Sequence, residues 1–371
     1  MRRELESIEI PGESEARART WSVLSAAFTE RQPVERPSRR MRLALAAAIV
    51  VAALAAVFSS PGRAVLDEIR EVVGVERAQP ALFSLPSPGR LLVASDAGVW
   101  VVQQDGSKRL LGAYREASWS PFGRFVVAAR ENELAALEPD GDVRWTLARP
   151  GVRFPRWTGT ETDTRIAYVD RTGIRVVAGD GTGDRLLVPG ASGPIAWRPG
   201  AGFVLAHTTA TRARAIDATT EAVVWQAPRP AGRVTTVEWS SNGRRVLVLS
   251  PHHLGVYDGR GRLVDQESPS ENWPDVDAAF RPETTEVAVA RVHGSQSSAY
   301  ILSGRQIVNG TGVFRELEWA PDGRWLIVTW QTADQWIVAR AGGRPIRGVS
   351  NVSEQFRSRS FPRVQGWCCV P

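Results

Sequence analysis

The side chains best suited to bind a ligand or exchange protons in this chain are four histidines that share one place in the sequence pattern. Each comes at or just after the end of a short aliphatic run, as in Val-Leu-Ala-His and Val-Leu-Ser-Pro-His-His. They are His207, His252, His253 and His293. Imidazole titrates near neutral pH and is a common metal ligand, so this set could bind a polar ligand or supply an acid and a base.

Other polar or aromatic residues hold the same place after other aliphatic runs. They are Arg130, Glu131, Asp170, Arg171, Arg291 and Trp330. If these runs are strands that end on one side of a fold, their last residues meet there. We therefore predict a ligand-binding rim made of His207, His252, His253, His293, Arg130, Arg171, Arg291 and Trp330. A metal ion would need every ligand about 2 Å away, and neighbouring strand ends diverge, so no metal and no cofactor is assigned.

Motifs for enzymatic chemistry are absent from the sequence. It contains no Gly-x-Ser-x-Gly, no His-Glu-x-x-His and no Gly-x-x-x-x-Gly-Lys. These motifs build a nucleophile elbow, a zinc site and a phosphate-binding loop, respectively. We therefore predict a protein that is not an enzyme. A hydrolase or lyase acting through the rim histidines is the alternative.

The two cysteines, Cys368 and Cys369, are adjacent. Two cysteines do not complete a zinc site alone, and consecutive Cα atoms lie about 3.8 Å apart, below the usual range for a disulfide. We expect small apolar side chains that finish the last strand. A redox-active pair is the alternative.

One repeated pattern predicts the elements that position these residues. Its clearest copy runs from Leu317 to Val328, with Trp-Ala-Pro-Asp-Gly-Arg between two segments of alternating apolar residues. Proline and glycine suit a reverse turn, and the alternation suits strands on both sides. The anchor of each copy is an aromatic residue, or a leucine in the first: Leu85, Trp119, Trp157, Trp197, Trp239, Phe280 and Trp319. Successive anchors are 34, 38, 40, 42, 41 and 39 residues apart.

A period near forty residues, filled with short strands, is typical of a β-propeller. We predict an all-β fold with seven blades over residues 81–371, six or eight being the alternatives. The repeat resembles the bacterial WD40-like (PD40, TolB-type) propellers, in which Trp-Ser-Pro-Asp-Gly-Arg precedes an aliphatic strand. That resemblance implies a platform that binds other molecules. Trp367 repeats the anchor position once more, so we expect Val364–Trp367 to pair into the first blade and close the ring.

The N-terminal part is predicted to cross a membrane. Residues 41–60 contain the uninterrupted apolar run Leu43–Phe58, nearly the length that a spanning helix needs. Arginines cluster before this run and acidic residues follow it, which places the N-terminus in the cytoplasm and the propeller outside the cell membrane. A cleaved signal peptide is the alternative. Residues 61–80 are expected to form a linker with a short amphipathic helix.

Residues 1–40 are predicted to be a cytoplasmic tail with a short amphipathic helix. Trp21, Leu24 and Phe28 fall on one stripe of it and could bind a partner. A regulator that holds a cytoplasmic factor, as anti-sigma proteins do, is therefore an alternative function. Against it, these residues contain no cysteine or histidine for the zinc motif of many such domains.

The charge balance argues against a nucleic-acid partner. Net charge is +6 over 371 residues, and Lys108 is the sole lysine. No Lys/Arg run with interleaved aromatic residues occurs in the repeats. We expect a membrane-anchored platform that holds an unidentified protein or small ligand.

Overall fold

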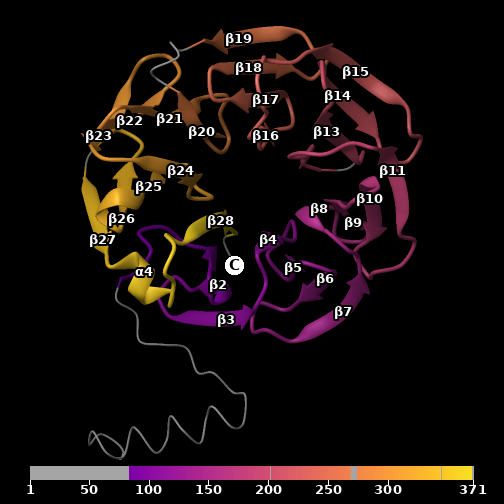
Figure 1. The fold of residues 1–371 in the computed structure, drawn as a ribbon, viewed down its shortest axis with the longest axis horizontal. Helices are drawn as coiled ribbons and strands as arrows, with labels where there is room; N and C mark the ends of the chain where they lie inside the picture. Colours follow the sequence, from indigo (N-terminus) through magenta and orange to yellow (C-terminus); the bar gives the residue numbers. More distant parts are fainter. Residues whose placement is uncertain (1–82, 201, 269–273, 344, 370–371) are drawn as a thin grey trace, which may run out of the picture. The chain divides into compact units, whose positions relative to one another are not determined.

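The computed structural model of the protein describes residues 83–200, 202–268, 274–343 and 345–369. These residues form seven four-stranded antiparallel sheets arranged as blades around a common axis (Figure 1). The predicted seven-bladed propeller is confirmed. Blades 1 and 7 are far apart in the sequence but lie side by side in space, which closes the ring.

Within each blade, the strands follow one another from the axis of the ring to its outer edge. Blade 1 has β28 (Arg363–Cys368), β1 (Arg90–Ser95), β2 (Gly98–Val102) and β3 (Lys108–Gly112); blade 2 has β4 (Glu116–Trp119), β5 (Val126–Arg130), β6 (Glu133–Leu137) and β7 (Val143–Ala148); blade 3 has β8 (Arg153–Gly159), β9 (Thr164–Val169), β10 (Gly173–Ala178) and β11 (Arg185–Pro189). Blade 4 has β12 (Ala196–Trp197), β13 (Val204–Thr208), β14 (Arg212–Asp217) and β15 (Val223–Pro228); blade 5 has β16 (Thr236–Trp239), β17 (Arg245–Ser250), β18 (His253–Asp258) and β19 (Leu263–Glu267). Blade 6 has β20 (Asp275–Phe280), β21 (Val287–His293), β22 (Gln296–Ile301) and β23 (Gln306–Thr311); blade 7 has β24 (Phe314–Trp319), β25 (Trp325–Trp330), β26 (Gln335–Arg340) and β27 (Ile346–Ser350).

The second strand of each blade is largely aliphatic because it is buried on both faces. In β17, Val246 and Val248 pack toward blade 4, whereas Leu247 and Leu249 pack toward blade 6. Successive side chains of a strand point to opposite faces, so one strand serves two interfaces. The described core accordingly divides into seven clusters, one between each pair of neighbouring blades. Each fully buried Val or Leu contributes about 1.5–3 kcal/mol.

The repeated turn ends the innermost strand and brings its anchor aromatic into the core. In blade 7, the Gly323 N–H donates to the Ala320 carbonyl at 2.8 Å. Gly323 has a φ of 63°, which glycine adopts without the usual steric cost. The preceding Trp319 is 4% exposed, and the guanidinium of Arg281 from blade 6 lies 5.6 Å from its ring centroid.

The ring is closed by the C-terminal strand, as predicted. Strand β28 pairs antiparallel with β1, with Trp367 opposite Leu91 and Val364 opposite Val93. Residues 83–89 form no strand of their own, so β28 takes the place of the missing inner strand of blade 1. The first and last parts of the described chain are thereby joined within one sheet.

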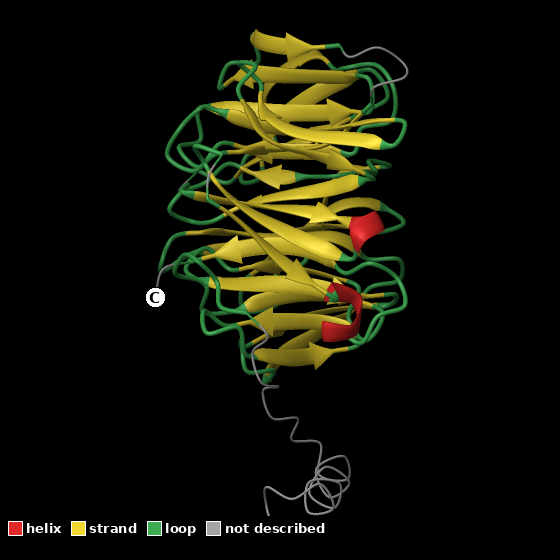
Figure 2. Cartoon of the chain, turned by 90° about the vertical axis from the view of Figure 1, so that its left-hand side faces the viewer, coloured by secondary structure: helices red, strands yellow, loops and turns green. Residues whose placement is uncertain are grey.

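The two sides of the ring carry different loops. Because the strands alternate in direction, the loops between second and third strands share one side with the connections to the next blade. We call this side the BC face, and the opposite side, which carries the repeated turns, the AB face. Seen edge-on in Figure 2, the short helices η2 (Gln331–Ala333) and α4 (Val352–Gln355) lie along the same edge, which is the BC face.

The predicted N-terminal segments 1–40, 41–60 and 61–80 lie outside the described residues, together with Trp21, Leu24 and Phe28. Within the part of the chain that the structure describes, no helix has the length and apolar character needed to cross a bilayer.

Candidate functional site

The predicted rim residues do share the BC face, but they do not form one site. His207 lies inside β13, paired with Arg214, and is 3% exposed. Burial lowers the pKa of its imidazole to about 4, so the ring is neutral near pH 7. His207 is therefore not exposed at a ligand-binding rim, because β13 continues through it to Thr208 and blade packing covers the ring.

Arg291 is held in a buried ion network between blades 5 and 6. Its guanidinium Nε lies 2.7 Å from Asp275 and its Nη2 lies 2.7 Å from Glu267. Tyr300 donates to Glu267 at 3.0 Å, and its ring lies under the guanidinium. Burial raises the pKa of Asp275 to about 6 even though Arg291 opposes the change. Arg291 therefore stabilises the seam between two blades rather than presenting a free cation.

The remaining histidines border this network on blades 5 and 6. His252 lies in the turn after β17 and contributes a charge interaction to Asp275. His253 begins β18 with its Nδ1 3.0 Å from the Ser268 hydroxyl, and His293 ends β21. Among the described residues, no three His, Cys, Asp or Glu side chains are placed to share a metal ion.

Trp330 also has a packing role. Its ring lies 5.9 Å from that of Phe314 in an edge-on arrangement, and its Nε1 donates to the Thr311 carbonyl at 3.0 Å. These contacts fix the connection between blades 6 and 7.

Arg130 and Arg171 are different, because both line hollows on the BC face over blades 1 to 3. Three adjoining hollows have volumes of about 370, 360 and 500 Å³, and Arg115 borders all of them. Arg153 joins Arg171 in the first hollow, and Arg363 lines the third. We name the three together the arginine trough. Sequence reasoning found two of its five arginines; the other three lie just before or at the start of an innermost strand, a position that it did not consider.

A buried carboxylate organises the wall between blades 2 and 3. Asp184 accepts hydrogen bonds from Arg149, Tyr168 and Arg175, the last at 2.6 Å. Burial opposes its ionisation, yet the bonds from Arg175 and Tyr168 hold its pKa below the ordinary range. The Asp184 side chain is 7% exposed, so little water could reach the arginines to replace its hydrogen bonds if the carboxylate were removed.

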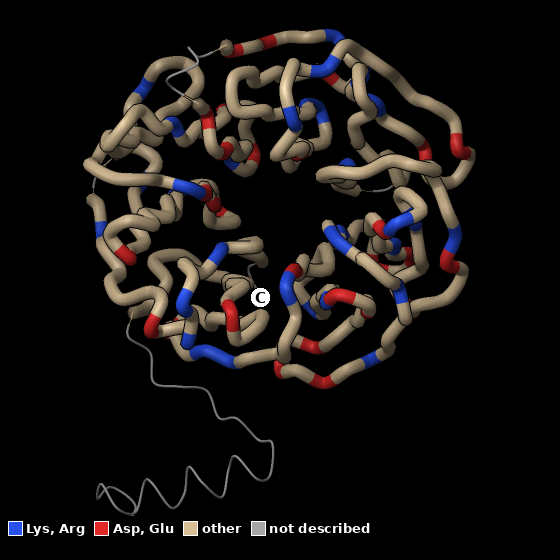
Figure 3. Tube along the Cα trace, viewed as in Figure 1, with Lys and Arg blue, Asp and Glu red and all other residues tan. Residues whose placement is uncertain are grey.

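The innermost strands carry a ring of acidic residues that the sequence analysis missed. They are Glu116 on β4, Glu238 on β16, Asp277 on β20, and Glu316 and Glu318 on β24. Each lies one or three residues before an anchor aromatic, so its side chain leaves the strand on the face opposite to the anchor. That spacing was a usable signal. Figure 3 shows acidic positions at the inner ends of the blades.

Each of these carboxylates ties its blade to the next one. Glu116 accepts from the Phe154 N–H at 2.6 Å, and Asp277 accepts from the Leu317 N–H at 2.9 Å. The others accept backbone N–H groups of the following innermost strand in the same way, Glu238 from Phe280, Glu316 from Val364 and Glu318 from Trp367. A backbone donor at a strand edge is thus satisfied by a side chain from the neighbouring blade.

Crowding of these acids makes ionisation costly. Burial raises the pKa of Glu316 to about 8 and that of Glu318 to about 7, and the nearby charge of Asp277 adds to both. Burial, followed by the charge of Glu318, raises the pKa of Glu238 well above its usual range. The pKa of Asp277 is raised to about 6 by burial. Arg156 on β8 is the countercharge, although burial lowers its own pKa.

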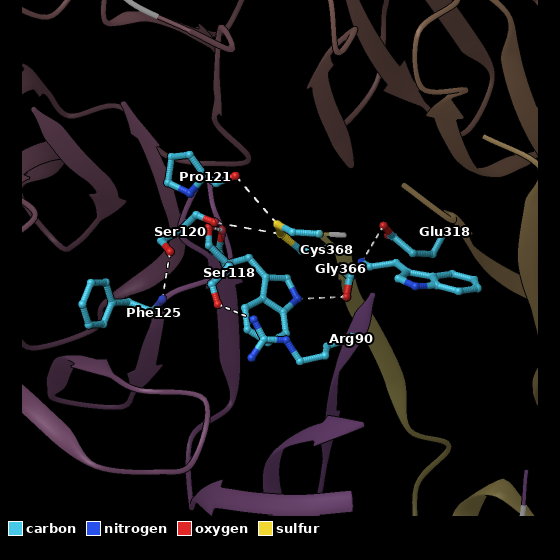
Figure 4. The surroundings of a disulfide bond; sticks show 12 residues. Arg90, Ser118, Ser120, Pro121, Phe125, Glu318, Gly366 and Cys368 are labelled. Atoms are coloured by element: carbon cyan, nitrogen blue, oxygen red, sulfur yellow. Dashed lines mark hydrogen bonds between the residues drawn. A yellow bond between two sulfur atoms is a disulfide. The ribbon is translucent and has the colours of Figure 1, made fainter. Parts of the chain in front are cut away.

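Cys368 and Cys369 are joined by a disulfide, which the expectation of two small apolar side chains did not include (Figure 4). Strand β28 ends at Cys368, so the two side chains are no longer held to opposite faces by strand geometry. The sulfurs lie against the turn of blade 2, with Cys369 Sγ 3.7 Å from the Pro121 carbonyl oxygen. The pair therefore packs at the end of the closing strand.

Blade number, strand order and buried anchors define the fold as a WD40-like β-propeller. Among solved structures, the chain is similar to the β-propeller domain of Cps50 (Swd1) from Myceliophteria thermophila, with a TM-score of 0.55 and 15% sequence identity. The similarity covers 70% of this chain and 99% of that one, and it bears on the fold alone. No family model matches the sequence. No curated protein matches it either.

Proposed function

We propose that the protein is a membrane-anchored, extracytoplasmic platform that binds a protein or ligand partner on its BC face, over blades 1 to 3. The observation that carries this proposal is the arginine trough, where three adjoining hollows bring exposed arginines of several blades together. A rigid ring that presents side chains from separate blades on one face suits binding, because little conformational entropy is lost on association.

The anchoring part of the proposal rests on the sequence. The apolar run Leu43–Phe58 follows a cluster of arginines, and it precedes a propeller whose repeat resembles the TolB type. Carbonate extraction of membranes tests it directly. The full-length protein should stay in the membrane pellet, and deletion of residues 41–60 should release it. Release of the full-length protein by carbonate would overturn this part.

Site-directed photocrosslinking in membranes of the source organism tests the platform itself. Benzoylphenylalanine replaces Asn132, which is exposed in the second hollow, or Phe122, which is 46% exposed in a turn on the AB face. The Phe122 replacement preserves an aromatic side chain and is therefore a matched control. We expect a discrete adduct from position 132 and none from position 122. Equal adducts from both positions, or none from position 132, would contradict binding at the BC face.

A further inference from the structure

The arginine trough crosses blade boundaries without interruption. Arg130 and Glu131 border both the first and the second hollow, and Ala113 borders both the second and the third. The arginine trough is lined by the connections before β4, β8 and β28 and by the loops between the second and third strands of blades 1 to 3. The trough therefore has the extended outline of a segment of chain rather than of a single small group.

Three carboxylates in the trough are already engaged by the protein. Asp96 accepts from the Arg359 and Ser360 N–H groups at 2.8 and 2.9 Å. Asp170 accepts from the N–H and hydroxyl of Thr172, and Glu116 accepts from the Phe154 N–H. Their lone pairs serve loops and blade contacts, so they are poorly placed to neutralise arginines across the trough.

Two further carboxylates pair with two of the arginines. Arg130 contacts Glu133 at 2.9 Å, and Arg115 lies 3.6 Å from Glu131 with both side chains largely exposed. Exposed pairs of this kind contribute about 0–1 kcal/mol and exchange readily. Arg115 is therefore available to another carboxylate.

Among the described residues, no carboxylate forms a salt bridge with the other three arginines, Arg153, Arg171 and Arg363; the charge of Arg363 only opposes the raised pKa of the buried Glu316. The Arg153 guanidinium lies 5.7 Å from the ring centroid of Phe154, and Arg363 donates to the Arg115 carbonyl at 3.1 Å. The stem of Arg171 lies beside Gly151, where an added Cβ would come within 3.1 Å of its Cγ. These contacts position the side chains and leave most of their five N–H donors unused.

We infer that the trough binds an extended acidic polypeptide segment, whose carboxylates pair with Arg153, Arg171 and Arg363. Guanidinium groups match carboxylates with two parallel hydrogen bonds, and their placement on blade 1 (Arg363) and blade 3 (Arg153 and Arg171), on either side of blade 2, suits carboxylates separated along a peptide. The carboxylates of the trough favour this ligand over a uniform polyanion, since a phosphate or sulfate on every unit would be repelled at Glu131 and Glu133. This inference rests on the proposed platform and names the chemistry of its partner.

Fluorescence anisotropy with the full-length protein tests the inference. The probe is a labelled short peptide of alternating glutamate and glycine, and its glutamine counterpart measures the contribution of charge. The test variant is R153Q/R171Q, and the matched control is R124Q/R324Q, which removes two exposed arginines from turns on the AB face. Circular dichroism and the thermal midpoint check that both variants keep the fold.

We expect the glutamate peptide to bind, the glutamine peptide to bind at least about tenfold more weakly, and R153Q/R171Q to weaken binding by about tenfold or more. The control variant should bind like the unmodified protein. Equal binding of both peptides, equal loss in both variants, or preference for heparin over the peptide at equal charge would overturn the inference. If crosslinking from position 132 persists and is unchanged by R153Q/R171Q, the platform stands and the acidic ligand does not.

Discussion

Replacing Glu316 by glutamine should stabilise the protein in a pH-dependent way. Glutamine keeps an oxygen that can accept the Val364 N–H, which lies 2.9 Å from the carboxylate, and removes the charge. The pKa of Glu316 is raised from 4.5 to about 8, chiefly by burial. The folded protein therefore holds a proton that the unfolded chain releases, and the resulting stability is present below about pH 4.5 and is lost as the pH rises through about 8.

The magnitude follows from the same pKa values. A pKa rise from 4.5 to about 8, at 1.36 kcal/mol for each pH unit, corresponds to about 5 kcal/mol. Glu316 is partly accessible to solvent as a residue, which reduces this cost, so we expect about 2 kcal/mol of added stability at pH 8. At pH 4 both the protonated Glu316 and the glutamine that replaces it are neutral, so the difference in stability between the two proteins should vanish.

Urea unfolding of the full-length protein, followed by tryptophan fluorescence between pH 4 and 8, measures this difference. Glu161→Gln is the control, because Glu161 is exposed and the same change there should have little effect at any pH. If Glu316→Gln is no more stable than the unmodified protein at pH 8, the ionised carboxylate is not costly in the native ring and the reasoning is refuted.

Three further perturbations test other contacts by thermal or urea unfolding. Deleting residues 362–371 removes β28, including Trp367, and should lower the free energy of unfolding by more than the about 3–5 kcal/mol of a single buried Trp→Ala change; an unchanged melting midpoint would contradict ring closure. Asp184→Asn should cost about 3 kcal/mol, because two largely buried arginines lose their countercharge, and a loss under about 0.5 kcal/mol would show that water replaces it. Gly98→Ala should cost more than about 3 kcal/mol, since its Cβ would lie 2.0 Å from the Gly112 carbonyl oxygen at a φ of 129°. Gly141→Ala is its control, with a φ of 102° and no atom within 4 Å of the added Cβ, and should cost about 1–2 kcal/mol; similar losses at both glycines would count against the steric reason.

The strands of the propeller could be predicted from the sequence because each one begins and ends at residues that favour turns. In blade 7, the two apolar segments predicted on either side of the turn within Leu317–Val328 fall in β24 and β25. Blade 4 departs from the pattern, since its innermost strand is only Ala196–Trp197. Prolines at positions 194 and 199 flank it and lack the N–H that a longer ladder needs.

The candidate site was harder to predict from the sequence, because contacts with the neighbouring blade decide whether the residue at the end of a strand is buried, paired or exposed. His207 and Arg291 both follow aliphatic residues, as Arg130 does, yet the first is covered by packing and the second is paired with buried acids. The repeat period predicts where each blade begins, but it does not predict which charged side chains of the neighbouring blade will contact a given residue. The acids one or three residues before the anchors were different, because alternation along the innermost strand is enough to place them on the face opposite to the anchor.

The position of β28 also affects how the protein is made. Strand β1 leaves the ribosome long before its inner partner, so the nascent first blade must wait with an unpaired edge while six more blades are synthesised. An unpaired edge of this kind can pair with other chains, and completion of the fold depends on residues that are translated after the other six blades. Truncated or stalled products should therefore be open rings prone to aggregation, even though nearly every blade is already complete.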